Sequence, residues 1–104
     1  RGVRVSVSAH EPLEAIIIAA PVEEGGSPFL MRPERVKVNQ RGAANYAREV
    51  HDIFVNDAHA KRLLVGETFN PPGNWSSYPP HKHDGRDGEP RLEEVYHYRV
   101  YPPQ

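Results

Sequence analysis

Two histidines, His81 and His83, are separated by a single residue. On a strand, residues two apart project from the same face, so both imidazoles can be aimed at one point. Imidazole is a good ligand for zinc, manganese, iron, copper or nickel. A catalytic metal usually takes three protein ligands and keeps one position open, so the pair needs a partner from a neighbouring strand. The spacing predicts a metal site, although two surface histidines would give the same pattern.

Two carboxylates could supply the third ligand. Glu93 and Glu94 follow His83 by ten and eleven residues, across a charged, glycine-containing loop at residues 84–90. A hairpin between the two segments would bring one carboxylate beside the histidines. Because side chains alternate along a strand, only one of the two can face them, and the spacing does not decide which.

Other polar residues carry weaker signals. Arg48 and Arg99 could each bind a substrate carboxylate through two hydrogen bonds, or could simply be solvated. Glu67 is a second possible inward carboxylate. Lys82 should point away from the histidines, toward solvent or the surroundings of the site.

Three further side chains complete the set of candidates. Trp75 lies in a proline-rich loop, where it could touch a sugar or pack the loop against the fold. His51 and His59 have no partner pattern, and we interpret both as surface or loop residues.

The composition predicts a small domain made of short strands. The chain has 104 residues, 38% of them apolar, with 11 prolines and 8 glycines. This favours strands joined by turns over a helical bundle. The net charge is −1 without a basic run, so neither nucleic acid nor an anionic membrane is an expected partner. The longest apolar run, residues 15–22, is too short to cross a bilayer.

The chain contains no cysteine. This excludes a disulfide framework and a thiol nucleophile, and it fits a cytoplasmic protein. There is no signal-peptide pattern.

Strand patterns recur along the chain. Residues 3–8 alternate apolar and polar side chains, and residues 13–20 form an apolar run with three consecutive isoleucines. Further strands are expected from residue 36, over 62–69, at 81–83 and over 92–101. Residues 46–54 fit either a helix face or a strand, and their β-branched and aromatic residues favour the strand.

Turns and connections separate these strands. Turns are expected at residues 56–58 and 71–74. Residues 21–35 lose all periodicity and are predicted to form a connecting segment. The pattern as a whole predicts an all-β sandwich or barrel.

The long run FNPPGNWSSYPPHKHD at residues 69–84, followed by LEEVYHYR at 92–99, gives a specific resemblance. It is similar to the bacterial 5-deoxyglucuronate isomerase family of inositol catabolism. The resemblance continues more weakly through residues 41–51. That family has a two-cupin fold and is related to the ketol isomerase that acts on 5-keto-4-deoxyuronate.

The resemblance implies a fold and a domain organisation. We expect an all-β cupin, a double-stranded β-helix or jelly-roll barrel, present here as a fragment of a two-cupin protein. Residues 1–20 would end the first cupin half, residues 21–35 would connect the halves, and residues 36–104 would begin a second, metal-binding half.

The resemblance also implies a ligand set of two histidines, one glutamate and a later histidine. His81 and His83 match the first two, and Glu94 matches the glutamate because it directly precedes a Val-Tyr pair. No histidine follows His97, which shares a strand face with Glu93. The fourth ligand is therefore expected beyond Gln104.

The implied activity is an isomerisation of 5-deoxyglucuronate to 5-dehydro-2-deoxygluconate, with a sugar acid as substrate. The cofactor would be a divalent metal, zinc first, with manganese or iron as alternatives. Strand alternation places Tyr96 and Tyr98 on the face of Glu94, so both are candidate catalytic residues, although they could equally fill a barrel. Monomer and homo-oligomer both remain open.

A different function is also compatible with the same ligands. A metal-binding cupin could be a sugar sensor or an iron-dependent dioxygenase. The dioxygenase would need redox-active iron and open coordination positions, whereas the isomerase works with zinc or manganese.

Overall fold

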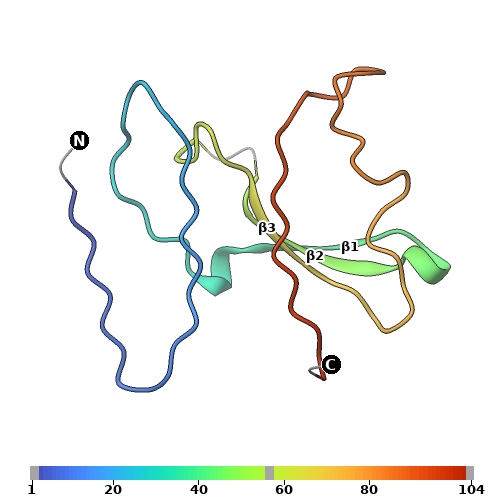
Figure 1. Cartoon of the computed structure of the whole chain (residues 1–104), viewed down its shortest axis with the longest axis horizontal. Helices are drawn as coiled ribbons and strands as arrows, with labels where there is room; N and C mark the ends of the chain where they lie inside the picture. Colours follow the sequence, from blue (N-terminus) through green and yellow to red (C-terminus); the bar gives the residue numbers. More distant parts are fainter. Residues whose placement is uncertain (1–2, 56–57, 103–104) are drawn as a thin grey trace.

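The computed structural model describes residues 3–55 and 58–102 (Figure 1). Within these residues the regular elements are three strands and two short 3-10 turns. In chain order they are η1 (Pro33–Arg35), β1 (Lys37–Arg41), η2 (Ala44–Tyr46), β2 (Arg48–Phe54) and β3 (Val65–Phe69). The described residues contain strands and no α-helix, which agrees with a composition that favours strands over a helical bundle.

The three strands form one antiparallel sheet in the order β1-β2-β3. Asn39 of β1 lies opposite Val50 of β2, which in turn lies opposite Thr68 of β3. The register between β2 and β3 shifts between Asp52 and Phe54. Such an irregularity bends the strand and increases its twist.

Glycines allow close backbone approaches at two places, one in the β1–β2 connection and one within β3. Gly42, between β1 and β2, has φ +75°, and a Cβ there would lie 2.2 Å from the carbonyl oxygen of Tyr46. Gly66 in β3 faces the carbonyl oxygen of His51, which would lie 2.9 Å from an added Cβ. Both positions are therefore restricted to glycine by the neighbouring backbone.

Several predicted elements are confirmed. Residues 48–54 form a strand rather than a helix, and Tyr46 lies in η2 just before it. The strand expected over 62–69 is present from Val65, and the one expected from residue 36 begins at Lys37. The turn at 71–74 is closed by a hydrogen bond from the amide of Asn74 to the carbonyl of Pro71.

The connecting segment predicted over residues 21–35 contains no strand. Residues 21–32 form no ladder and lead into η1. Of the turn predicted at residues 56–58, Asn56 and Asp57 lie outside the described residues.

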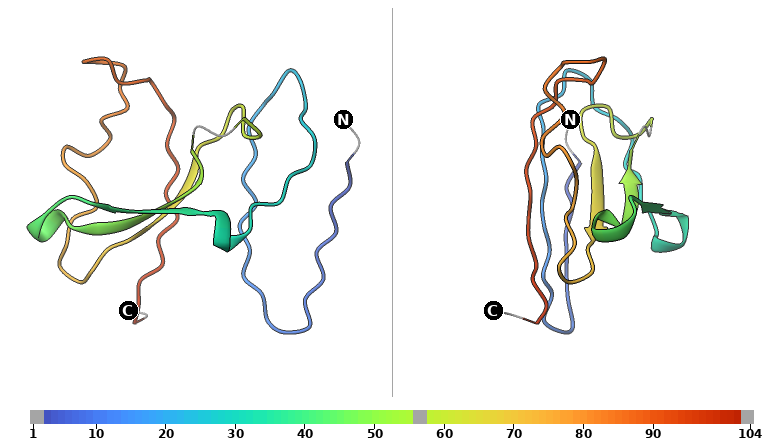
Figure 2. Two further views of the ribbon diagram at one scale, coloured as in Figure 1. Left: turned by 180° about the vertical axis from the view of Figure 1, so that it is seen from behind. Right: turned by 90° about the vertical axis from the view of Figure 1, so that its right-hand side faces the viewer.

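Three segments that were predicted as strands form no strand in the structure. Residues 3–8, 13–20 and 92–101 run extended, yet none of them joins a ladder with another described segment. Figure 2 shows the three segments in one layer beside the sheet. Segments 13–20 and 92–101 are linked by side chains, since Glu14 Oε2 lies 2.9 Å from Arg99 Nη2. Their sequence pattern fits a strand, but no other described segment offers them the backbone groups that a ladder requires.

None of the described residues is buried. The best-covered element is β2, which is half-buried along its length. One small cluster packs at the end of β2, where the Phe29 ring stacks on His59 with centroids 3.9 Å apart and meets Phe54 edge-on at 6.2 Å. The described residues therefore form a sheet without a core, and they do not close the barrel that the resemblance implies.

Candidate functional site

The carboxylate of Glu94 lies between the two histidines. Its Oε2 is 2.8 Å from His81 Nδ1, and its Oε1 is 3.9 Å from His83 Nε2. The carboxylate is the least exposed of the three side chains, at 23% against 69% for His81 and 42% for His83. The structure thus brings together the two histidines and the glutamate that the sequence singles out.

Pairing of two backbone segments produces this convergence. The amide of Leu92 donates to the carbonyl of His83 at 3.1 Å, and Asp84 forms an antiparallel bridge with Arg91. The loop between them folds back, so Glu94 lies beside the histidines. The expected hairpin contact is therefore present, although it is a single bridge and not a pair of strands.

The extended conformation predicted at residues 81–83 is wrong. His81 has φ +54°, in the left-handed region, and it follows a turn at Pro80. The amide of Asp84 also donates to the carbonyl of Lys82 at 2.8 Å, which tightens the backbone. The two imidazoles therefore reach Glu94 by a bent backbone, since the alternation argument applies only to an extended one.

The loop that leads to the histidines is fixed on the sheet. Asn74 donates from Nδ2 to the carbonyl of Ala47 at 2.8 Å, and the Trp75 amide donates to the carbonyl of Asn45 at 2.8 Å. These bonds join the loop to the β1–β2 connection. Trp75 itself is 64% exposed, so its indole is not buried against the fold.

Tyr96 lies beside Glu94 as expected. Its hydroxyl donates to Glu94 Oε1 at 3.0 Å, and its ring meets His81 edge-on with centroids 5.6 Å apart. The Tyr98 ring stacks on Tyr96 with centroids 5.9 Å apart. Tyr96 is thus in contact with the His81–Glu94 pair, whereas Tyr98 reaches them only through Tyr96.

The hydrogen bonds in this cluster shift two pKa values in opposite directions. The hydrogen bond with His81 holds the pKa of Glu94 below its ordinary 4.5, and the Tyr96 hydroxyl and both imidazoles act the same way, against a smaller effect of burial. Burial and then the hydrogen bond to Glu94 raise the pKa of Tyr96 above 10.0. At neutral pH the cluster therefore holds an ionised carboxylate and a neutral phenol.

Glu89 is a site neighbour that the sequence did not indicate. Its Oε2 lies 3.5 Å from His83 Nδ1, and its Oε1 lies 3.7 Å from Lys82 Nζ. Nothing in its spacing distinguishes it from the other charges of the 84–90 loop. Only the fold of that loop brings it back to His83. Lys82 has the peripheral position expected for it, joined to the histidine through Glu89.

The other candidate residues lie elsewhere. Arg48 donates from Nη1 to the carbonyl of Tyr46 at 3.0 Å, and Arg99 pairs with Glu14. His97 Nε2 is 3.7 Å from the same Glu14. None of these contacts joins the cluster around Glu94.

His51 belongs to the sheet. Its Nε2 lies 2.6 Å from Glu49 Oε1, and its ring packs on Phe69. The hydrogen bond between His51 and Glu49 lowers the pKa of Glu49 below its ordinary 4.5. Glu67 of β3 lies opposite His51 of β2 in the strand register and is exposed. The ring of His59 stacks on Phe29.

A metal ion can be tested against the donors of the cluster. Two imidazoles and a carboxylate are donor types that zinc, manganese and iron accept. Among the described residues, however, no three His, Asp or Glu side chains are arranged to hold a metal as they stand. Here the Glu94 carboxylate contacts the imidazoles directly. The donor chemistry fits a metal, and the observed geometry is that of a hydrogen-bonded cluster.

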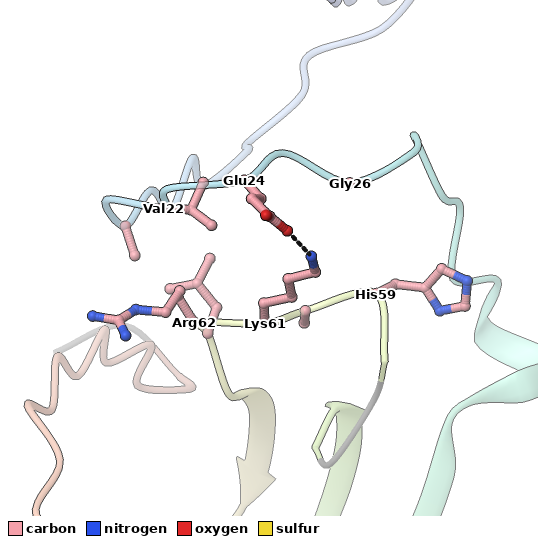
Figure 3. Close-up of a pocket in the computed structure, with 9 residues that line it drawn as sticks. Val22, Glu24, Gly26, His59, Lys61 and Arg62 are labelled. Atoms are coloured by element: carbon pink, nitrogen blue, oxygen red, sulfur yellow. Dashed lines mark ion pairs between the residues drawn. The ribbon is translucent and has the colours of Figure 1, made fainter. Parts of the chain in front are cut away.

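A separate cavity of about 150 Å³ lies between the 20–26 segment and residues 59–63. Figure 3 shows Lys61 pointing across it to Glu24, with Nζ 3.7 Å from Oε2. None of the residues that line it belongs to the cluster around Glu94. In the part of the chain that the structure describes, no helix is long and apolar enough to cross a membrane.

The fold and the cluster define a mostly β protein with two histidines and a tyrosine gathered around one glutamate. The family model described as "KduI/IolB family" matches residues 1–104, and the chain belongs to this family. No solved structure matches it.

Relatives of this chain include bacterial enzymes named 5-deoxy-glucuronate isomerase. The chain is 43% identical over 98 residues to the 5-deoxy-glucuronate isomerase of Geobacillus thermodenitrificans, covering 92% of this chain and 36% of the relative. It is 45% identical over 101 residues to the enzyme of the same name from Bacillus velezensis, covering 94% and 37%. The corresponding protein of Bacillus subtilis is 36% identical over 102 residues, covering 94% and 37%. The chain thus spans little more than a third of the relatives it matches.

Proposed function

We propose that this chain is part of a metal-dependent aldose–ketose isomerase that converts 5-deoxyglucuronate to 5-dehydro-2-deoxygluconate. The observation that carries the proposal is the convergence of His81, His83 and Tyr96 on Glu94. The relatives named 5-deoxy-glucuronate isomerase support this reaction and a sugar acid as substrate.

We further propose the domain organisation that goes with this function. Residues 36–104 would contribute to a metal-binding cupin half, residues 1–20 to the preceding half, and residues 21–35 to their connection. The extended segments at 3–8, 13–20 and 92–101 suit this arrangement, because each lacks a ladder partner within the described residues.

The isomerisation moves a proton between adjacent carbons through an enediolate. His81, His83 and Glu94 would hold a divalent ion, zinc first, which when bound supplies a Lewis acid for the substrate carbonyl and hydroxyl oxygens. Tyr96, neutral at physiological pH, can donate its hydroxyl proton to a substrate oxygen. Tyr98 would orient the Tyr96 ring through stacking.

The test combines metal content, isomerase activity and two histidine variants. We expect stoichiometric zinc in the purified isomerase of which this chain is proposed to be part, together with conversion of 5-deoxyglucuronate. His81→Ala and His83→Ala should lose the metal, because each removes a proposed ligand. Loss of a residue that only contacts a ligand typically lowers activity about 10–100-fold, and kcat/KM should fall further than this in both variants. His97→Ala is the matched control, because its ring contacts Glu14 and not the cluster.

Two results would contradict the proposal. Iron with oxygen consumption and no isomerisation would indicate the dioxygenase alternative. Metal content and activity that are unchanged in both variants would show that the two histidines have no role in catalysis.

A further inference from the structure

The 84–90 loop places a second carboxylate on His83. The imidazole of His83 has two ring nitrogens, and each faces a different glutamate. Nε2 lies 3.9 Å from Glu94 Oε1, and Nδ1 lies 3.5 Å from Glu89 Oε2. His81 differs, because its Nδ1 faces Glu94 itself.

The position of Glu89 is fixed by its loop and by a neighbouring cation. The amide of Glu89 donates to the carbonyl of Arg86 at 2.9 Å, closing a turn in which Asp87 and Gly88 both have positive φ. Lys82 Nζ lies 3.7 Å from the other carboxylate oxygen, Oε1. Glu89 is thus held between a lysine and a histidine that flank one another in sequence.

We propose that Glu89 is a positioning residue that selects the tautomer of His83. A neutral imidazole carries one proton, which can be on either nitrogen. A carboxylate at 3.5 Å is beyond a short hydrogen bond, but it still favours the proton on Nδ1. The competing contact of Nε2 with Glu94 Oε1 is longer, at 3.9 Å, and that oxygen already accepts the hydrogen bond of Tyr96. The lone pair is then on Nε2, the nitrogen that faces Glu94.

This choice matters for the proposed metal site, on which the inference rests. Only a nitrogen with a lone pair can bind a metal ion. Histidine ligands generally donate their other ring proton to a carboxylate, a backbone carbonyl or water, which fixes the ring and raises its basicity. Glu89 would have this role for His83, with Lys82 holding the carboxylate in place.

The experiment measures the tautomer and the metal affinity separately. Ring-nitrogen NMR of the metal-free protein, at a pH where the imidazoles are neutral, reports which nitrogen of each histidine is protonated. A zinc titration gives the affinity. The variants are Glu89→Gln, which keeps the shape and removes the charge, and Glu93→Gln as control. Glu93 makes no hydrogen bond or ion pair with any other described residue.

In Glu89→Gln we expect His83 to lose its preference for a proton on Nδ1, while His81 is unchanged. Zinc affinity should fall about tenfold or more. Lys82→Met, which frees Glu89 without touching His83, should cause a smaller change in the same direction. Glu93→Gln, with the same change in net charge, should alter neither quantity.

An unchanged His83 tautomer in Glu89→Gln overturns the inference, and so does an equal change in Glu93→Gln. Failure of the proposed function has a different signature. A wild-type protein that binds no zinc contradicts the metal site, and the tautomer measurement then still decides the role of Glu89. Circular dichroism of each variant excludes loss of structure as the cause.

Discussion

At the scale of single residues, the cluster around Glu94 is an electrostatic unit. One carboxylate contacts two imidazoles and accepts a phenol hydrogen bond. The pKa shifts reflect this, because the pKa of Glu94 is lowered and that of Tyr96 is raised. The charge on Glu94 therefore adds to the effect of burial in keeping Tyr96 protonated.

We predict that Glu94→Gln lowers the pKa of Tyr96 toward 10.0 without fully restoring it. The carboxylate raises this pKa by accepting the hydrogen bond of the hydroxyl and by repelling the phenolate. In the variant the repulsion disappears, and the hydrogen bond is made to a neutral amide oxygen and is weaker. Burial, the largest cause, remains. Tyrosine ring-carbon NMR across the alkaline range measures the shift. A Tyr96 pKa that stays the same or rises would contradict it, and Tyr78, outside the cluster, serves as the internal reference.

At the scale of elements, the site depends on connections more than on strands. The loop at 70–80 is joined to the β1–β2 connection by Asn74 and Trp75, and the histidines follow it. The conformation of that connection in turn depends on Gly42. A disturbance there should therefore be transmitted to the loop that leads to the histidines.

We predict that Gly42→Ala weakens the β1–β2 connection. An alanine at this position would have to adopt the left-handed backbone of Gly42, which costs about 1–2 kcal/mol. Its Cβ would also lie 2.2 Å from the carbonyl oxygen of Tyr46. Measured in the proposed full isomerase and not in the 104-residue chain alone, amide hydrogen exchange of β1 and β2 should accelerate about tenfold or more, since 1.4 kcal/mol corresponds to a factor of ten.

Gly73→Ala is the matched control for this prediction. Gly73 has φ +80°, and nothing lies within 4 Å of its added Cβ, so it has the backbone cost without the clash. A smaller acceleration, confined to its own turn, is expected. Equal protection of β1 and β2 in wild type and Gly42→Ala would contradict the role of Gly42.

At the scale of the whole molecule, the chain lacks the compactness of an independent domain. Its radius of gyration is 16.2 Å, whereas a compact chain of this length has about 13 Å. It exposes 10116 Å², against about 5,900 Å² for a compact protein of this mass. Exposed apolar side chains include Ile17 and Val95, at 95% and 97%. Burial of apolar area is the main driving force for folding, so these 104 residues have little to stabilise them.

We predict that the 104-residue chain on its own unfolds without a cooperative thermal transition and binds a hydrophobic dye such as ANS. Both follow from apolar surface that no described segment covers. Calorimetry and dye fluorescence measure them, with the full-length relative from Bacillus subtilis as the control. A sharp calorimetric transition without dye binding would contradict the prediction.

The sequence predicts which side chains of the cluster meet better than how the backbone brings them there. Residue type, spacing and resemblance point to His81, His83 and Glu94, and the structure brings these three together. The predicted backbone conformation is wrong, because the pattern predicts an extended backbone at His81 and the observed φ is +54°. The prolines before it made a bend as reasonable as a strand, and only tertiary contacts decide between them.

The sequence by itself determined which side chains could do chemistry and which segments would be extended. These depend on residue type and on periodicity over a few neighbours, which are local properties. Tertiary structure alone decided that Glu89 returns to His83 and that residues 13–20 and 92–101 have no described ladder partner. Loop closure and strand pairing require groups far apart in the chain to meet, and no local pattern encodes that meeting.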